Sequence, residues 1–224
     1  MQVTVGKPMD IDVHAVKFDA TIYPREKHNK GTVATYKESF QAGATFPPIL
    51  IEAETGRLLD GKHRWLAAQE AGVGTLSACA VTVDMPKTTQ DKETGEEVAD
   101  PKYTAALLCY ATQVNAEHGD RVTNDEKKKA MRAYVESDEA ANITDMALRF
   151  GVHHATAYRW VDDILTRRKH QENLLFWWLG WVLGWTQEDV AEATGVTHQT
   201  VSNRLATFSQ MRNACKDKSS RMTP

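Results

Sequence analysis

The sequence predicts an α+β protein, in which a small domain with a mixed β-sheet is followed by an all-α region with two helix-turn-helix units. Three observations support this fold class. Up to about residue 120, short β-branched runs alternate with segments of helical periodicity. After that point the pattern is helical, and helices begin at recognisable capping residues. Within this second half, one helix–glycine–helix pattern occurs twice, 44 residues apart.

Length and charge divide the chain in a similar way. Its 224 residues leave room for two or three small domains, and 42% hydrophobic with 25% charged residues is ordinary for a soluble globular protein. Residues 1–120 carry 12 Lys and Arg against 17 Asp and Glu, whereas residues 121–224 carry 15 against 13. The net charges are therefore −5 and +2, so contact with a nucleic acid is expected in the second half.

The chain carries no sequence signal for export or for a membrane. Its three cysteines, Cys79, Cys109 and Cys215, are widely spaced, which implies neither a disulfide framework nor a cysteine zinc site. The N-terminus lacks the basic and apolar regions of a signal peptide, and the longest apolar run, 174–185, is too short to span a bilayer. We therefore expect a cytoplasmic protein.

Residues 1–120 are expected to form the first domain. The patterns predict strands at 11–18, 49–53, 57–59 and 76–83, and helices at 31–43, 62–71 and 103–114. The second and third strands form a hairpin that delivers the chain to Gly61. Residues 84–102 are rich in charge and lack an apolar period, so we expect a flexible or hairpin-like insertion there.

The domain is organised around the turn Gly61-Lys62-His63-Arg64, which lies between a strand and a helix. Glycine permits close approach of the backbone, and the three basic residues fall in the first helical turn, where unpaired N–H groups and the helix dipole already create positive potential. Three cations are unfavourable there unless an anion binds, so the turn predicts a phosphate site. The alternative is a surface turn with solvated charges.

These features resemble the N-terminal domain of ParB partition proteins, which shares its fold with sulfiredoxins. The resemblance rests on the order of elements, the Pro24-Arg25 turn, the Pro48-Ile49 strand and Gly61-x-His63-Arg64. It implies that Arg25 and the turn bind the phosphates of a nucleotide, which is CTP in the partition proteins. Sulfiredoxins carry a catalytic cysteine where this chain has Lys62, so the resemblance argues against sulfiredoxin chemistry. The family's usual acidic and arginine residues are replaced by Lys62 and His63, which leaves the identity of the nucleotide open.

A second motif of the family is similar to Asn115-Ala116-Glu117-His118-Gly119. In the family, the asparagine helps to hold the triphosphate and its Mg²⁺, so the resemblance implies that Asn115 and His118 bind the nucleotide. Glu117 and His118 replace the usual polar-arginine pair, and this variant resembles ParB-fold transcriptional activators. An alternative interpretation makes Asn115 a helix C-cap and Gly119 the helix stop.

The second half contains the repeated helical pattern. Thr123-Asn124-Asp125-Glu126 is a capping box, and Asn142 caps a helix that ends at a glycine turn. The two copies of the pattern align as Asn142 with Thr186, Asp145 with Asp189, Ala147 with Ala191, Gly151 with Gly195, Val152 with Val196, His154 with His198 and Thr156 with Thr200. Because cap, crossing residue and turn match together, we predict helix-turn-helix units over 121–170 and 171–209.

Recognition helices place their outward N-terminal side chains in the major groove of DNA. In the first unit these residues are His154, Ala155, Tyr158 and Arg159, and in the second they are His198, Gln199, Ser202 and Asn203. Arginine suits guanine, whereas glutamine and asparagine suit adenine, because each can form two hydrogen bonds with that base. The sequence therefore predicts binding to double-stranded DNA, and the alternative is that the units mediate only protein contacts.

Four of the six tryptophans lie between the two units, at Trp177, Trp178, Trp181 and Trp185. This apolar surface is wider than the stripe that one core face requires. Either the helix is wholly buried in its own three-helix unit, or the excess face forms a homodimer or an interdomain contact. The polar tail, 210–224, lacks the C-terminal dimerisation domain typical of partition proteins, which favours another pairing surface.

Two functions fit these observations. The first is a sequence-specific DNA-binding protein of ParB-like type, acting in plasmid, phage or chromosome partition or in transcriptional regulation at the nucleoid or a plasmid. A nucleotide with Mg²⁺, CTP by resemblance, would switch it, and slow triphosphate hydrolysis is compatible with that role. The second is an enzyme of the same fold, a phosphotransferase or nuclease, in which Asp60, His63, Arg64 and His118 act as acid, base or metal ligands. The first is favoured because a small-molecule enzyme does not need paired helix-turn-helix units.

Overall fold

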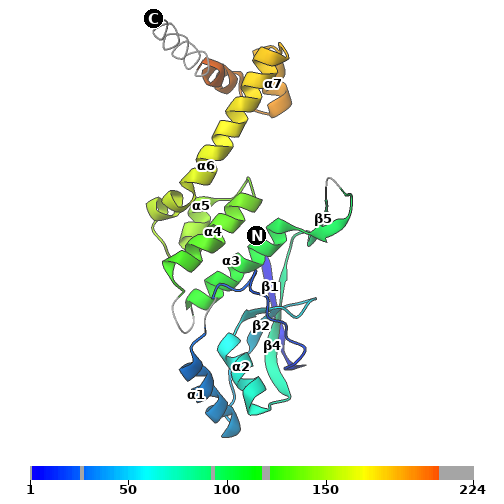
Figure 1. The fold of residues 1–224 in the computed structure, drawn as a ribbon, viewed down its shortest axis with the longest axis vertical. Helices are drawn as coiled ribbons and strands as arrows, with labels where there is room; N and C mark the ends of the chain where they lie inside the picture. Colours follow the sequence, from blue (N-terminus) through cyan, green and yellow to red (C-terminus); the bar gives the residue numbers. More distant parts are fainter. Residues whose placement is uncertain (1, 26–27, 92–93, 118–121, 207–224) are drawn as a thin grey trace, which may run out of the picture. The chain divides into compact units, whose positions relative to one another are not determined.

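A computed structural model describes residues 2–25, 28–91, 94–117 and 122–206 (Figure 1). The chain divides into two compact units, with the boundary between Val161 and Asp162. The N-terminal unit contains the sheet together with the first helices of the all-α region, and the C-terminal unit is helical. Among the described helices, none is apolar over enough residues to cross a bilayer.

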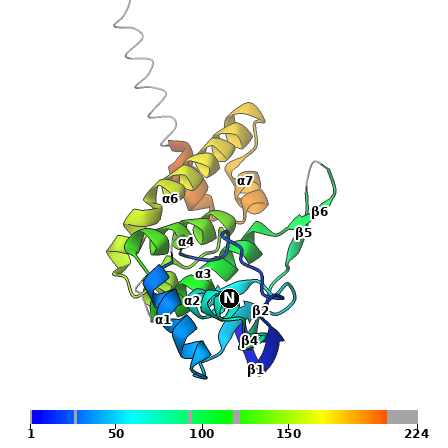
Figure 2. The same cartoon turned by 60° about the horizontal axis from the view of Figure 1, so that its bottom comes forward.

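The N-terminal unit is built on a mixed four-stranded sheet in the order β1-β4-β2-β3 (Figures 1 and 2). Strand β1 (Val3–Asp12) runs antiparallel to β4 (Thr75–Val83), and β4 runs parallel to β2 (Ile49–Glu52). Strand β3 (Leu58–Asp60) pairs antiparallel with β2 in the predicted hairpin. Because β3 ends directly before Gly61, the sheet carries the predicted turn at its edge.

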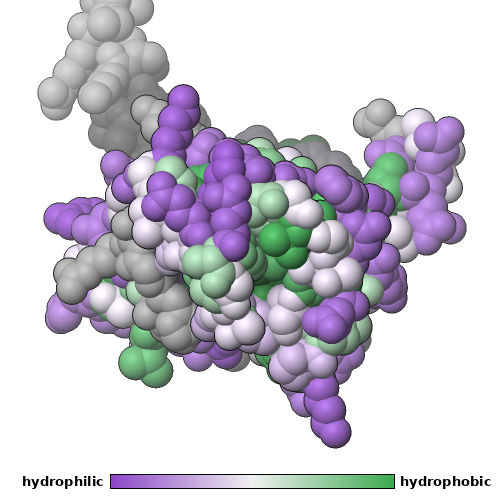
Figure 3. Space-filling view, turned by 90° about the horizontal axis from the view of Figure 1, so that it is seen from below, coloured by the Kyte–Doolittle hydropathy of each residue, from purple (hydrophilic) through white to green (hydrophobic). Residues whose placement is uncertain are grey.

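Helices cover both faces of this sheet. On one face α2 (Lys62–Ala71) packs through Trp65 against a core that includes Leu58, and α1 (Lys30–Gln41) packs against α2. On the other face α3 (Pro101–Glu117) packs through Leu107 against a core that includes Leu59. Adjacent residues of a strand point to opposite faces, so β3 is buried on both sides. Seen from below, the molecule presents hydrophilic side chains around a smaller apolar area (Figure 3).

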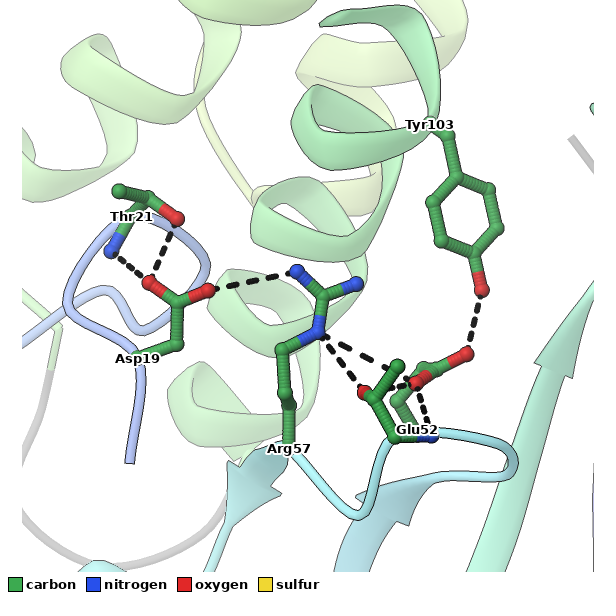
Figure 4. A network of polar contacts seen from close by, with 6 residues as sticks. Asp19, Thr21, Glu52, Arg57 and Tyr103 are labelled. Carbon is green, nitrogen blue, oxygen red and sulfur yellow. Dashed lines mark hydrogen bonds and ion pairs between the residues drawn. The ribbon is translucent and has the colours of Figure 1, made fainter. Parts of the chain in front are cut away.

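A buried polar network fastens α3 to the β2–β3 hairpin (Figure 4). The Glu52 carboxylate is 1% exposed and accepts hydrogen bonds from the Tyr103 hydroxyl at 2.8 Å and from the Thr55 backbone N–H at 2.8 Å. The Arg57 guanidinium lies between Glu52, at 4.0 Å, and Asp19, at 3.3 Å. Burial opposes the charged form of Glu52, but the hydrogen bonds from Thr55 and Tyr103 outweigh it, so the pKa of Glu52 is lowered.

The strand expected at 11–18 is wrong in its position. Strand β1 starts eight residues earlier than expected. Residues 13–18 form no strand, and the β-bridge that they make is the isolated one between Lys17 and Arg57. Gly6 and Pro8 interrupt the apolar alternation of this strand, which is why its pattern was not strand-like. An edge strand tolerates a proline, because one side of the strand is unpaired. The register of β1 with β4 shifts between Val5 and Pro8, as in a β-bulge.

The charged insertion at 84–102 contains a hairpin. Strands β5 (Thr88–Gln90) and β6 (Glu97–Ala99) pair antiparallel as a separate two-stranded sheet. This hairpin projects from the rest of the N-terminal unit (Figures 1 and 2).

Helices α4 (Asn124–Ser137), α5 (Ile143–Arg149) and the start of α6 (His154–Trp177) complete the N-terminal unit. The predicted capping box at the start of α4 and the Asn142 cap of α5 are both confirmed. Helix α4 also holds the two later helices through their backbones. Lys127 donates to the carbonyl of Phe150 at 2.7 Å, and Arg132 donates to that of Trp160 at 2.8 Å.

The C-terminal unit begins inside α6. Helix α6 continues without a break to Trp177, past residue 170, where we placed the end of the first helix-turn-helix unit. No glycine or proline occurs between residues 164 and 177, so nothing in the sequence stops the helix. A π-helical turn, η1 (Trp178–Val182), follows, and then come α7 (Gln187–Thr194) and a helix over 198–206. Their core contains Phe176, Leu179, Val190 and Val201.

Candidate phosphate-binding cavity and nucleic-acid surfaces

One cavity of about 620 Å³ in the N-terminal unit is lined by every predicted nucleotide-site residue that the structure describes. These residues are Arg25, Gly61, Lys62, His63, Arg64 and Asn115. They come from the segment before α1, from the first turn of α2 and from α3, and the sheet brings these segments together. The remaining predicted residue, His118, lies outside the described residues.

Gly61 determines the shape of the turn at the mouth of α2. Its φ is +93°, a conformation that favours glycine, and a Cβ at this position would lie 2.5 Å from Ile49 Cγ2. The turn therefore depends on the missing side chain for both its backbone conformation and its packing on β2. It places the N-terminus of α2, the positive end of the helix dipole, at the wall of the cavity.

Lys62 is buried beside aromatic rings. The residue is 8% exposed, and its ammonium lies 3.9 Å from the centre of the Phe18 ring and 5.5 Å from that of Tyr23. Burial lowers the pKa of Lys62. A cation–π contact offsets part of the cost of removing an ammonium from water. The side chain therefore adds positive charge to a partly desolvated cavity wall, where an anion would be attracted most strongly.

Arg64 is engaged within the protein in this arrangement. Its guanidinium lies 2.9 Å from the Asp60 carboxylate and donates to the carbonyls of Pro47, at 2.6 Å, and Pro48, at 3.0 Å. Both members of the ion pair have side chains no more than 15% exposed. These contacts engage both terminal nitrogens of the guanidinium within the protein, so the structure gives Arg64 a role in holding the turn.

His63 and Arg25 make contacts with the neighbouring segments. The Nε2 atom of His63 accepts a hydrogen bond from the Asn29 backbone N–H at 3.0 Å, so this nitrogen carries no proton in the arrangement described. Because Asn29 caps α1, His63 links the start of α1 to the start of α2. Arg25 donates to the backbone carbonyl of Asn115 at 3.0 Å.

Asn115 has a structural position in the cavity wall. It lies within α3, which excludes the expected alternative of a C-cap. Its amide donates to the carbonyls of Leu59, at 2.8 Å, and Ala111, at 2.7 Å, and its Oδ1 accepts from the Tyr23 hydroxyl at 3.2 Å. The same hydroxyl accepts from the Lys62 backbone N–H at 3.3 Å. Tyr23 therefore connects Asn115 to the first amide of α2.

The Asn115 amide oxygen already accepts one hydrogen bond, from Tyr23, which leaves one of its two lone pairs for a ligand. Within the ranges that the structure describes, no three His, Cys, Asp or Glu side chains are grouped as a metal site would require. Mg²⁺ is commonly held by substrate phosphates and waters with only one or two carboxylates. An Mg²⁺ ion that arrives with a nucleotide would thus depend mainly on the phosphates, with Asp60 as the carboxylate of the cavity.

The cavity also contains residues that the sequence analysis missed. Thr32 and Tyr36 line it from α1, and Phe46 lines it from the segment before β2. The rings of Tyr36 and Phe46 are 5.0 Å apart, so together they form an apolar part of the cavity wall. The spacing of Thr32 and Tyr36 puts both on one face of α1, and this periodicity was a usable signal.

The predicted DNA-reading residues of the first unit lie on the exposed face at the start of α6. His154, Ala155, Tyr158 and Arg159 are all exposed, whereas Ala157, between them, is fully buried. The rings of His154 and Tyr158 are 4.5 Å apart. The turn before them contains Gly151 with a φ of +59°. These contacts leave one side of the first helical turns facing solvent.

The second unit repeats this arrangement at the predicted offset. Gly195 has a φ of +68°, and Thr197 caps the helix that follows it. The predicted reading residues are His198, Gln199, Ser202 and Asn203, of which the first two and the last are exposed. Gln199 donates to the Asn203 side-chain oxygen at 3.0 Å, so these two amides form one hydrogen-bonded pair.

The chain is similar to ParB proteins. It matches the C-terminally truncated chromosome-partitioning protein ParB from Caulobacter crescentus in two solved structures. In the complex with CTP-γ-S, the identity is 16% and the TM-score 0.37, over 91% of this chain and 79% of that one. In the complex with the centromeric parS site, the identity is 16% and the TM-score 0.42, over 89% and 97%.

A Pnob8-like ParB-N domain is also similar, at 12% identity and a TM-score of 0.32, over 79% of this chain and 85% of that one. No family model and no curated protein match the chain. A similarity of this extent says nothing of what this chain binds, so the functional argument rests on its own residues.

Proposed function

We propose that the chain is a DNA-binding protein whose N-terminal unit binds a nucleoside triphosphate in the cavity at α2. One observation carries the proposal: six residues that the sequence analysis assigned to a nucleotide, from three separate segments, line one cavity of about 620 Å³. This volume lies in the usual range for small-molecule sites, roughly 300–1,000 Å³. The helix N-terminus and Lys62 favour the phosphates, and the Tyr36–Phe46 wall suits a base.

CTP is the first nucleotide to test, because the Gly61-x-His63-Arg64 turn resembles the CTP-binding turn of ParB partition proteins. The DNA-binding surfaces would be the exposed first turns of α6 and of the 198–206 helix. The biological role that follows is partition or transcriptional regulation at the nucleoid or on a plasmid. The nucleotide would act as the switch between states of the protein.

The contacts in the cavity support binding more than chemistry on a small molecule. Asp60 is paired with Arg64, and the Nε2 of His63 accepts from Asn29. The carboxylate and the imidazole that an acid–base mechanism would use are thus both engaged by the protein. Slow hydrolysis of a bound nucleotide is compatible with this proposal, and phosphate release measures it directly.

The nucleotide part is tested by calorimetric titration of CTP, ATP, GTP and UTP with Mg²⁺, in the presence and absence of DNA. Lys62→Met should weaken binding of the preferred nucleotide about 10- to 100-fold, because a hydrogen bond to a charged group contributes roughly 1.5–3 kcal/mol. Lys7→Met, on the exposed edge strand β1, is the matched control. Binding that is equal in the two variants, or no binding of any nucleotide, would exclude the cavity.

The DNA part is tested with a cognate site obtained by selection from random duplexes. Gln199→Ala and Asn203→Ala should each weaken cognate binding by roughly 1–3 kcal/mol and spare random DNA. Because the two side chains are hydrogen bonded to each other, the double variant should lose less than the sum of the single losses. Gln171→Ala, exposed on α6, serves as the control. Equal losses on cognate and random DNA would reject base readout.

A further inference from the structure

A second cavity of the N-terminal unit is lined by residues of α3, α4 and α5, and we call it the α3–α5 cavity. Its volume is about 200 Å³, and none of its lining residues lines the cavity at α2. Part of its wall is apolar and buried, because Cys109, Met146 and Phe150 are 6%, 5% and 2% exposed. Ala140 and Ala141 also line it, and their small side chains leave room for a ligand.

Helix α3 separates the α3–α5 cavity from the candidate nucleotide site. Cys109 and Gln113 line the α3–α5 cavity and are four residues apart, so they share one face of α3. Asn115 lines the cavity at α2, and at about 100° per residue it lies roughly 200° around the helix from Gln113. The two cavities are therefore on opposite faces of α3, and a ligand in one does not occupy the space of the other.

The volume of the α3–α5 cavity suits a small molecule. An apolar cavity of about 150 Å³ is large enough to bind benzene. The α3–α5 cavity is slightly larger and has polar groups in its wall, so it has room for a ring or short chain that carries one polar group. Sites for drug-sized ligands are larger, at roughly 300–1,000 Å³. A nucleotide therefore does not fit here.

Arg149 is the charged group that remains available in this cavity. Its Nε donates to the Asp145 carboxylate at 2.8 Å, and among the described residues no further hydrogen bond or ion pair engages the guanidinium. Both terminal nitrogens are thus left for a ligand. Burial raises the pKa of the Cys109 thiol, whereas the charge of Arg149 lowers it. The positive charge therefore acts at the apolar part of the wall.

The two carboxylates of the cavity already have partners. Asp145 is paired with Arg149. Asp138 lies 3.1 Å from the Lys102 ammonium and accepts from the Ala140 backbone N–H at 3.1 Å. Neither acid therefore requires a cationic ligand. A guanidinium offers parallel N–H donors in one plane, which match the two oxygens of a carboxylate. The available guanidinium thus selects an anion, and a carboxylate in particular.

From this size, apolar wall and guanidinium, we propose that the α3–α5 cavity binds a small organic carboxylate with an apolar body. The carboxylate accepts hydrogen bonds from the terminal nitrogens of Arg149, and the ring or chain lies against Met146 and Phe150. This site is independent of the cavity at α2 and of the DNA-reading residues. Its failure would therefore leave the proposed function untouched.

Titration of the full chain with benzoate, phenylacetate and hexanoate, followed by the amide resonances of the isotope-labelled protein, tests the site. We expect saturable shifts that are largest at Cys109, Gln113 and Met146. Benzyl alcohol and benzylamine carry a neutral or a positive group on the same ring, and they should bind at least about tenfold more weakly than benzoate. No binding of any of the three carboxylates, shifts confined to the turn at Gly61, or tighter binding of benzylamine would each overturn the proposal.

Two variants test the guanidinium and the space separately. Arg149→Gln should weaken benzoate binding about tenfold or more, because it removes a charged donor. Lys37→Gln is the matched control, since Lys37 pairs with Glu70 in the same unit, is 37% exposed against 35% for Arg149, and does not line the cavity. Ala141→Leu should abolish binding by filling the cavity without changing a charge.

Circular dichroism shows that each variant folds, and if Ala141→Leu does not, the comparison of the other two variants decides. Benzoate binding that is equal in Arg149→Gln and Lys37→Gln would refute the proposed contact. Binding that persists in a folded Ala141→Leu variant would place the carboxylate outside the cavity and would also refute it.

Discussion

Replacing Arg64 by alanine should destabilise the N-terminal unit even without any ligand. The substitution removes the donor from two carbonyls, at 2.6 and 3.0 Å, and leaves the Asp60 carboxylate, 11% exposed, without its ion-pair partner. Breaking a buried pair costs roughly 3–5 kcal/mol, and the partial exposure of this pair puts the expectation at the low end, about 3 kcal/mol. For a chain of this size, that loss lowers the melting temperature by roughly 6–12 °C.

Thermal unfolding followed by circular dichroism measures the effect, with Arg149→Ala as the matched control. Arg149 pairs with Asp145 at the same i, i+4 spacing and at 2.8 Å, but the side chains of that pair are 35% and 50% exposed. Exposed pairs contribute roughly 0–1 kcal/mol, so the control should lower the melting temperature by only a few degrees. If Arg64→Ala costs no more than Arg149→Ala, then Arg64 does not hold the turn and its first role is in binding.

Three further predictions concern single residues that hold a turn, a buried network and a helix cap. Gly61→Ala should cost about 3 kcal/mol in urea unfolding, because its Cβ meets Ile49 Cγ2 at 2.5 Å in a left-handed backbone; a cost under 1 kcal/mol would contradict the close packing. Tyr103→Phe should cost about 2 kcal/mol by removing a donor from the buried Glu52 carboxylate. The lowered pKa of Glu52 stabilises the fold above its ordinary value of 4.5, and this contribution is lost as the pH falls through the folded pKa. The free energy of unfolding should therefore fall less steeply with decreasing pH in Tyr103→Phe than in the wild type. An unchanged fall would show that Glu52 does not cause it. Thr186→Ala should cost about 1 kcal/mol in the C-terminal unit, because it deletes the capping box of α7; a matched loss for Thr194→Ala, at the other end of the same helix, would argue against the cap.

Local chemistry made part of this fold predictable. The Thr123–Glu126 box and the Asn142 cap are formed by residues within three positions of each other, so the sequence contains all the information. The turn at Gly61 and the end of α2 at Gly72 are likewise set by single residues whose φ values are positive. The repeat at an offset of 44 residues was visible because cap, packing residue and turn recur together.

What the sequence did not contain is the set of partners that each site residue meets across the fold. Lys62 lies against Phe18, and His63 meets Asn29, although 44 and 34 residues separate these pairs in the chain. Such contacts depend on how the sheet brings segments together, which periodicity does not describe. We expected Lys62, His63 and Arg64 to bind one anion in equivalent ways. Their tertiary contacts differ, so the three residues have different roles.

Lys62 differs from Arg64 because its cation is buried against an aromatic ring and no carboxylate among the described residues pairs with it. A buried ammonium is costly, and a methionine of similar length could fill the same space beside Phe18 without that cost. If Lys62 served the fold, Lys62→Met would lower stability; we expect instead a melting temperature that is unchanged or higher, together with weaker nucleotide binding. If the substitution raises stability but weakens nucleotide binding, then Lys62 contributes to binding at a cost in stability. A variant that loses both together would place Lys62 with Arg64, among the residues that hold the turn.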